Sequence, residues 1–194
     1  MKKKAPTSPT DDRVVPIALR DDGGLRLVLV ADTHGKPHPD SARHIAARRP
    51  DAILHAGDIG DLGVLDELSK LAPVVAVRGN IDARVPGVPD VVAIEIQSPD
   101  RCVMRLLLVH IAVYGTKLRS EVWRRAVAEK ADMVICGHSH LPFAGRDRGV
   151  MVFNPGSIGP RRFGLPIVFG VFEVASGKAS LTHVDCETGL DWTP

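Results

Sequence analysis

Residues 25–34 read LRLVLVADTH, an apolar run that ends in an acid, a hydroxyl and an imidazole. The first seven of these residues, Leu25–Ala31, are typical of a strand that is buried on both faces of a sheet. Polar side chains directly after such a strand lie at its carboxyl end, where open α/β sheets bind their ligands. This stretch therefore predicts a buried parallel strand and one edge of a functional site.

The same arrangement of an apolar run and a polar cluster recurs along the chain. The further strands expected on this pattern are Ala52–His55, Val74–Val77, Cys102–Val109 and Met133–Cys136. Helices expected at Asp40–Arg49 and Val64–Leu71 alternate with the first three strands, as in parallel βαβ units. Later elements mix in antiparallel pairing, beginning with a hairpin. They are Val91–Ile96 paired with Cys102–Val109, the helix Ser120–Lys130, and strands at Val150–Phe153, Ile167–Val174 and Ser180–Val184.

The composition excludes several classes of protein. The 194 residues are 44% hydrophobic and 25% charged, as in an ordinary globular domain. A net charge of +2 gives no argument for nucleic-acid binding, and no apolar run reaches the roughly 18 residues of a membrane helix. We expect a flexible tail over residues 1–22 and a single domain over residues 23–194. Three scattered cysteines and no apolar signal segment favour the cytoplasm.

Five of the expected strand ends supply seven polar side chains: Asp32, His34, Asp58, Asn80, His110, His138 and His140. A single acid or imidazole after a strand is usually a cap or a satisfied polar residue, but five such ends together indicate a site. Carboxylate, amide and imidazole ligands favour Mn²⁺, Fe²⁺ or Zn²⁺ over Ca²⁺. Seven ligands suit two ions that share one carboxylate, and two ions about 3.5–4 Å apart suit phosphoryl transfer.

These residues occur in the order of a known set of motifs. The chain resembles the calcineurin-like metallophosphoesterase superfamily in Asp32-x-His34, Gly57-Asp58, Gly79-Asn80-x-Asp82, His110 and Gly137-His138-x-His140. Residues 154–157, Asn-Pro-Gly-Ser, and the following Pro160-Arg161 are similar to its small bacterial and archaeal phosphodiesterase branch. That branch also includes the retromer scaffold subunit of eukaryotes. The resemblance spans about residues 25–184 and implies a four-layer αββα sandwich of two mixed β-sheets flanked by helices.

The resemblance also implies a dinuclear metal site. One ion would be held by Asp32, His34, Asp58 and His140, and the other by Asp58, Asn80, His110 and His138. Asp58 would bridge the two, and a hydroxide between the metals would be the nucleophile. The implied catalytic residues are Asp58, Asn80, His110 and Asp82, the last as an orienting group or merely a turn residue. Mn²⁺ is the first choice of metal, and Ni²⁺, Fe²⁺ and Zn²⁺ are the alternatives.

The implied activity is hydrolysis of a small phosphodiester. Asn80, Arg161 and Arg162 are the candidates for substrate binding, since a guanidinium group can contact phosphate through two hydrogen bonds. Two alternatives stay open: a phosphomonoesterase, and a non-catalytic interaction scaffold like the retromer relative. A homodimer is a further expectation, because dimers are common in the branch.

Two positions depart from the superfamily pattern. Ile81 stands where much of the superfamily has a histidine, which implies little help in protonating the leaving group. Ile111 follows His110 where the branch usually has glycine, and a β-branched residue resists a positive φ. We therefore expect a displaced His110 loop and a weaker second metal. His55, three residues before Asp58, is a candidate for orienting that carboxylate through a hydrogen bond.

Overall fold

The strand predicted at Leu25 lies inside the first of two sheets in the computed structural model, which describes residues 13–193. This strand, β2 (Leu25–Val30), pairs in parallel with β3 (Ala52–His55), and β3 pairs in parallel with β4 (Val74–Ala76). On its other side, β2 pairs antiparallel with β12 (Val168–Ala175). The sheet ends with β13 (Lys178–Asp185) and β14 (Asp191–Trp192).

The second sheet also mixes parallel and antiparallel pairs. Its six strands run in the order β1 (Arg13–Ala18), β5 (Val91–Gln97), β6 (Cys102–Val109), β9 (Met133–Ile135), β11 (Val150–Asn154) and β10 (Phe143–Asp147). The predicted hairpin between β5 and β6 is confirmed. A small separate hairpin consists of β7 (Val113–Tyr114) and β8 (Lys117–Leu118).

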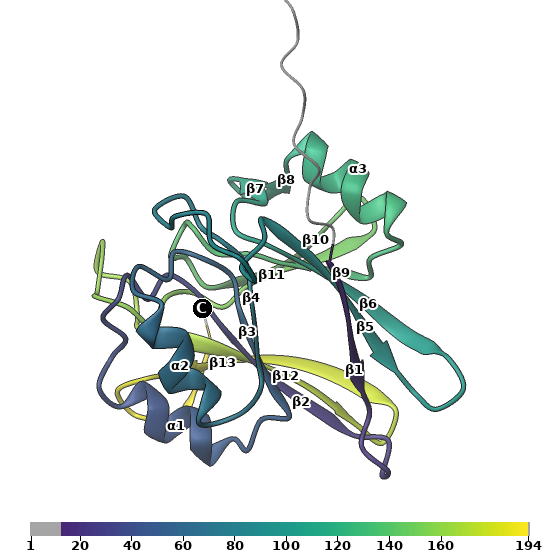
Figure 1. Cartoon of the computed structure of the whole chain (residues 1–194), viewed down its shortest axis with the longest axis horizontal. Helices are drawn as coiled ribbons and strands as arrows, with labels where there is room; N and C mark the ends of the chain where they lie inside the picture. The colour runs from purple at the N-terminus through teal and green to yellow at the C-terminus, as the bar shows by residue number, and fades with distance from the viewer. Residues whose placement is uncertain (1–12, 194) are drawn as a thin grey trace, which may run out of the picture.

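The two sheets stack face to face, and helices cover their outer faces (Figure 1). Alternate residues of β2 point to opposite sides, so Leu27 and Leu29 pack between the sheets while Val28 and Val30 pack in the core beneath the helices. The helices α1 (Ser41–Ala47) and α2 (Gly63–Ser69) contribute to that outer core. On the far side, α3 (Ser120–Ala128) packs on the second sheet. The four-layer αββα sandwich is confirmed.

One expected boundary is wrong. The tail predicted over residues 1–22 includes residues 13–18, which form β1 in parallel register with β5, from Arg13 opposite Val92 to Ala18 opposite Gln97. Val15 and Ile17 pack against the core between the sheets, which supplies the apolar burial that holds this edge strand. An edge position also tolerates Pro16, since an edge strand leaves some N–H groups unpaired. Residues 1–12 of the expected tail lie outside the described residues.

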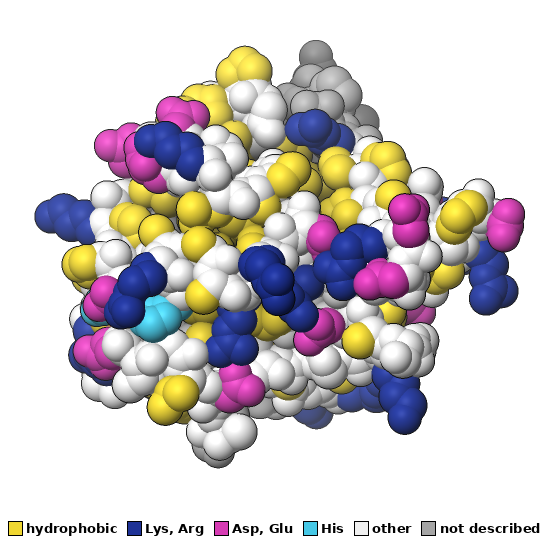
Figure 2. All heavy atoms as spheres, turned by 90° about the horizontal axis from the view of Figure 1, so that it is seen from below, with side chains coloured by type: hydrophobic (Ala, Val, Ile, Leu, Met, Phe, Trp, Pro, Cys, Tyr) yellow, Lys and Arg dark blue, Asp and Glu magenta, His cyan; other side chains and the backbone are white. Residues whose placement is uncertain are grey.

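The molecular surface agrees with the charge balance of the sequence. Figure 2 shows basic and acidic side chains interspersed with hydrophobic ones, so that face carries no continuous patch of a single sign. Among residues 13–193, no helix is both long and apolar enough to cross a membrane.

Candidate metal centre

The structure brings the seven predicted ligands to one rim of the sandwich. Asp32 and His34 follow β2, Asp58 follows β3, Asn80 follows β4, His110 follows β6, and His138 and His140 follow β9. Three of these strands belong to the first sheet and two to the second. The rim is therefore formed jointly by the carboxyl ends of strands from both stacked sheets.

Six of the seven side chains form two clusters, each with ligand atoms within 4.8 Å of one another. The first cluster contains Asp32, His34 and His140. Within it, the Nε2 atoms of His34 and His140 lie 3.2 Å apart, and Nε2 of His140 is 3.6 Å from Oδ1 of Asp32. The second cluster contains Asp58, His110 and His138.

Asp58 lies between the clusters and turns one carboxylate oxygen toward each. Its Oδ2 is 3.9 Å from Nε2 of His34, and its Oδ1 is 3.1 Å from Nε2 of His110. Asn80 joins the second cluster, with Oδ1 3.1 Å from the same His110 nitrogen. This placement fits a carboxylate that bridges two ions.

The hydrogen bonds of His110 test whether a cation fits. Its Nδ1 lies 2.7 Å from the carbonyl oxygen of Ala56, so Nδ1 carries the proton and donates it there. Burial lowers the pKa of His110, but its hydrogen bond to Asp58 and the nearby carboxylates outweigh burial and raise that pKa above its ordinary value. Once Nε2 gives up its proton, its lone pair faces the same side as two oxygens, one from Asp58 and one from Asn80. In the first cluster, the Nε2 atoms of His34 and His140 face each other, and Nε2 of His140 also lies near a carboxylate oxygen of Asp32. Converging lone pairs are stabilised by a metal ion, so the donor set fits two divalent cations.

Burial and charge set the protonation of these ligands. Burial raises the pKa of Asp32 to about 7 and lowers that of His140 to about 4. Burial also raises the pKa of Asp58, but the hydrogen bond and charge of His110 outweigh it and lower the pKa to about 2. Burial likewise lowers the pKa values of His34 and His138. These three imidazoles are therefore neutral at pH 7, which is the form that binds metals.

Five of the seven predicted ligands have a left-handed backbone. Their φ values are 55° at Asp32, 48° at His34, 54° at Asp58, 70° at His138 and 57° at His140. Such conformations are uncommon outside glycine and persist where the surrounding structure fixes them. Here the ligand loops are joined through their backbones, with the His34 N–H donating to the Asp58 carbonyl at 3.0 Å. A Cβ atom at Gly79 would collide with Asp58, which explains why glycine precedes Asn80.

Asp82 fastens the loop of Asp58 to the loop of Asn80. Its carboxylate accepts hydrogen bonds from the N–H groups of Ile59 at 3.0 Å, Gly60 at 2.8 Å and Gly79 at 2.8 Å. These contacts favour the orienting interpretation of Asp82 over that of an ordinary turn residue.

His55 supports the same loop from inside the protein, although the expected hydrogen bond to Asp58 is not made. Its Nδ1 accepts the N–H of Gly57 at 3.2 Å, and its Nε2 lies 3.1 Å from Oγ1 of Thr33. Thr33 Oγ1 in turn donates to the carbonyl of Ile59 at 2.9 Å. Burial lowers the pKa of His55 to about 4, so the ring is neutral and Nε2 donates to Thr33.

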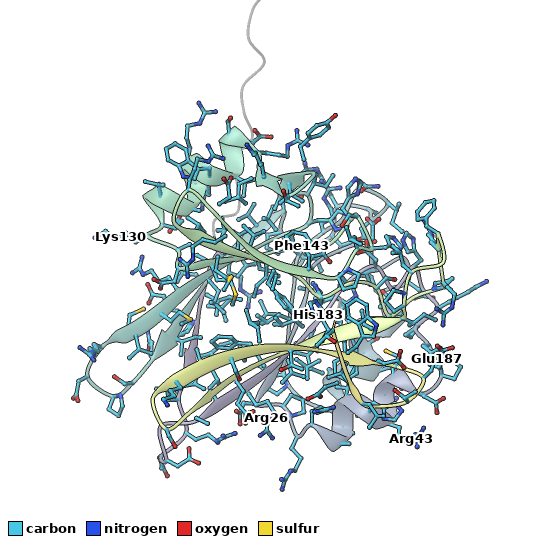
Figure 3. The ribbon with its side chains drawn as sticks, turned by 180° about the vertical axis from the view of Figure 1, so that it is seen from behind. Arg26, Arg43, Lys130, Phe143, His183 and Glu187 are labelled. Carbon is cyan, nitrogen blue, oxygen red and sulfur yellow. The ribbon has the colours of Figure 1, made fainter. Side chains whose placement is uncertain are left out.

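Asn154 and Ser157 support the loops of the predicted ligands, a role that the sequence analysis did not assign to their side chains. Asn154 Nδ2 donates to the Gly137 carbonyl at 2.9 Å and to Ser139 Oγ at 3.0 Å, which braces the loop that carries His138 and His140. Ser157 Oγ donates to the Asp32 carbonyl at 2.9 Å. His183, which lies on β13 in Figure 3, donates from Nε2 to the Asn154 carbonyl at 2.8 Å. The signal for these roles was a run of polar residues directly after a buried strand.

The geometry agrees with comparisons to known proteins. Residues 25–177 match the calcineurin-like phosphoesterase superfamily domain. The chain belongs to this superfamily. A probable metallophosphoesterase of Methanothermobacter thermautotrophicus is 36% identical over 141 residues, or 69% of this chain and 77% of that protein. Phosphodiesterase YfcE of Escherichia coli is 30% identical over 169 residues, or 77% of this chain and 88% of that protein.

The fold is also shared with solved structures. Vacuolar protein sorting 29 of Cryptosporidium parvum superposes with a TM-score of 0.69 at 19% identity, covering 87% of this chain and 94% of that one. Such low identity shows a common fold and carries no statement about activity.

Ile111, which stands where the branch usually has glycine, does not displace the loop that carries His110. The predicted displacement of the His110 loop is wrong, because Nε2 of His110 lies 3.1 Å from both Asp58 and Asn80. Ile111 is not among the described residues with a positive φ, so this position does not require glycine. The reason for expecting a weaker second metal is removed with it.

The two candidate arginines differ in their surroundings. Arg161 forms an ion pair with Glu187 at 2.5 Å and donates to the Leu165 carbonyl at 3.0 Å. Glu187 lies at the periphery of the molecule in Figure 3. Arg162 is exposed. Burial of Asp32, His34 and His140 has the largest effect on their pKa values, and the positive charge of Arg162 is a smaller effect that lowers all three. Both arginines line a small pocket together with His140, and Arg161 is the one that is paired with Glu187.

Proposed function

We propose that this chain is a dinuclear metal-dependent phosphodiesterase. The observation that carries the proposal is the position of Asp58, whose two carboxylate oxygens face two separate clusters of ligands. Membership of the calcineurin-like superfamily and the likeness to phosphodiesterase YfcE support the same activity.

The ligands divide between two ions on this proposal. Asp32, His34 and His140 would hold one ion, Asn80, His110 and His138 would hold the other, and Asp58 would serve both. When bound, the ions supply an activated water at neutral pH and stabilise negative charge on the phosphoryl oxygens. The mixed nitrogen and oxygen donors suit Mn²⁺ first, with Ni²⁺, Fe²⁺ and Zn²⁺ as alternatives.

Other side chains act on the substrate or on the ligands. Arg162 orients the phosphate, since both arginines line a pocket with His140 and Arg161 is already paired with Glu187. Asn80 belongs to the second cluster and also contacts the phosphate of the substrate. Asp82 positions the loop of Asp58. Ile81 offers no proton, so leaving groups that depart easily as anions are preferred.

A scaffold without catalysis is the alternative from another class, and the fold shared with vacuolar protein sorting 29 is the reason to test it. A scaffold does not need a complete set of ligands, and all seven residues converge here. The cytoplasmic location and the homodimer stay predictions.

A hydrolysis assay on the metal-loaded protein tests the proposal. We expect hydrolysis of bis(p-nitrophenyl) phosphate with Mn²⁺, loss of that activity in Asp58→Asn, and full activity in Asp100→Asn. Asp100 is the matched control because it is exposed and lies in the connection between β5 and β6, away from the rim. Faster hydrolysis of p-nitrophenyl phosphate would favour the monoesterase, and no hydrolysis with any of the four metals would favour the scaffold.

A further inference from the structure

A cavity of about 670 Å³ lies between the two sheets. Three of the four methionines of the chain line it, together with one aromatic and one aliphatic side chain: Met104, Met133, Met151, Phe172 and Leu181. Figure 3 looks at this side of the sandwich and shows side chains with sulfur atoms between the ribbons of β10 and β11 and those of β12 and β13. We call this space the methionine cavity.

The methionine cavity is separate from the metal centre. The strands β6, β9 and β11 run parallel to one another, and Met104, Met133 and Met151 lie toward their amino-terminal ends. The predicted ligands His110 and His138 follow the carboxyl ends of β6 and β9. Met104 precedes His110 by six residues, which is about 20 Å along an extended strand. The cavity therefore lies at the end of the sandwich away from the metal centre.

The two sheets form opposite walls of the cavity. Met133 lies beside Met151 in the register of β9 and β11, and Phe172 lies beside Leu181 in the register of β12 and β13. All four belong to the core between the sheets or pack against it. Protein interiors leave few voids larger than a water molecule, and a volume of about 300–1,000 Å³ is typical of small-molecule sites. Flexible methionine side chains adapt to the shape of a ligand.

An arginine and small residues line the more exposed part of the cavity. Ala144 and Arg146 lie on the same face of the edge strand β10, and both are exposed. Nη1 of Arg146 donates to the carbonyl of Gly149 at 2.8 Å, and a guanidinium group has five N–H donors, so Arg146 can bind an anion and keep this bond. The acidic residue of the lining, Asp132, accepts the N–H of Arg105 with Oδ2 at 2.9 Å.

We infer that the methionine cavity binds an amphipathic small molecule with a slender apolar body and an anionic head group, of the alkyl carboxylate class. The apolar body lies among the methionines and Phe172, and the head group contacts Arg146. Stacked sheets are about 10 Å apart, which leaves room between their side chains for an alkyl chain but not for a helix about 10 Å wide. The inference does not depend on the proposed function, because the cavity and the metal centre are separate.

Decanoate is the probe, and methyl NMR of the full chain labelled at methionine is the readout. The protein is loaded with Zn²⁺, which avoids the paramagnetism of Mn²⁺. We expect the signals of Met104, Met133 and Met151, assigned by single Met→Leu variants, to follow one saturation curve. Decanoate should bind about tenfold or more tightly than hexanoate, since each fully buried methylene contributes about a factor of four. Acetate, which has a carboxylate and no chain, should not move these signals.

Two variants test the apolar body and the head group separately. Ala144 is exposed, so the side chain in Ala144→Trp fills the cavity without removing a core contact and should weaken decanoate about tenfold or more. Arg146→Gln should weaken decanoate about two- to fivefold, the range of an exposed ion pair, and leave the affinity for decanol unchanged. The control is Arg43→Gln, on α1 at the outer face of the first sheet, in which both affinities should equal those of the parent.

Three results would overturn the inference. The first is a set of methionine signals that decanoate leaves in place. The second is tighter binding of decylammonium than of decanoate, which would assign the head group to Asp132. The third is a dimer in sedimentation that Ala144→Trp dissociates, which would assign the cavity to a second copy. The titration requires no catalysis, so its result is distinct from success or failure of the proposed function.

Discussion

Replacing Asp82 with alanine tests whether this carboxylate holds the metal-binding loops together. The change removes the acceptor for three backbone N–H groups, those of Ile59, Gly60 and Gly79. The bonds from Ile59 and Gly79 are partly buried, whereas the bond from Gly60 is exposed, so water replaces the Gly60 bond at little cost. A hydrogen bond to a charged group contributes about 1.5 kcal/mol or somewhat more, and less where water competes.

The expected loss in the free energy of unfolding is therefore about 2–3 kcal/mol. Urea unfolding of the metal-free protein measures it, with Asp61→Ala as the control. Asp61 accepts a single exposed hydrogen bond, from the Gly63 N–H at 2.9 Å, so its loss should cost less than about 0.5 kcal/mol. Titration with Mn²⁺ should show weaker binding in Asp82→Ala, because the loop that it fastens carries Asp58. Stability and metal affinity equal to those of the parent would refute this reasoning.

Three further predictions concern the leaving group, the phosphate and pH. Ile81→His should raise kcat/KM for alkyl diesters more than for aryl diesters, since positioned acid catalysis contributes about 10²–10⁴-fold; equal effects on both would contradict the absence of an acid. Arg162→Ala should raise KM about tenfold or more for a diester while Arg161→Ala leaves it within about twofold, as expected where only one guanidinium group contacts phosphate; the reverse order would exchange their roles. Burial raises the pKa of Asp32 to about 7 and lowers that of His140 to about 4. Because the proton on Asp32 competes with the ion, Mn²⁺ affinity should fall as the pH drops below about 7, while His140 stays neutral down to about 4; affinity that is flat between pH 5 and 8 would contradict this assignment.

Sequence patterns predicted the parts of this protein in which local chemistry determines structure. The buried strand at Leu25 and the polar residues that follow the strands depend on neighbouring residues alone, so their places could be predicted. The sequence analysis did not predict the strand at Arg13–Ala18 because Arg13 and Pro16 interrupt its apolar pattern, and because its partner strand β5 and the core that covers Val15 and Ile17 come from distant parts of the chain.

The same reasoning explains the errors around the site. Whether Ile111 displaces His110 depends on a hydrogen bond between that ring and Ala56, 54 residues away in the chain. The roles of Asp82 and His55 likewise depend on which backbone N–H groups the fold brings to them. The sequence shows which side chains can bind a metal, whereas the hydrogen bonds that position those side chains arise only in the tertiary structure.

The metal content of the parent and of Asp58→Asn tests the central claim most directly. Both proteins would be loaded with Mn²⁺, freed of excess metal and measured by elemental analysis, with bis(p-nitrophenyl) phosphate hydrolysis followed in parallel. Because Asp58 faces both clusters, the parent should hold two ions per chain, and the variant should lose both together with nearly all hydrolysis. Two ions retained in Asp58→Asn, with activity intact, would contradict the account.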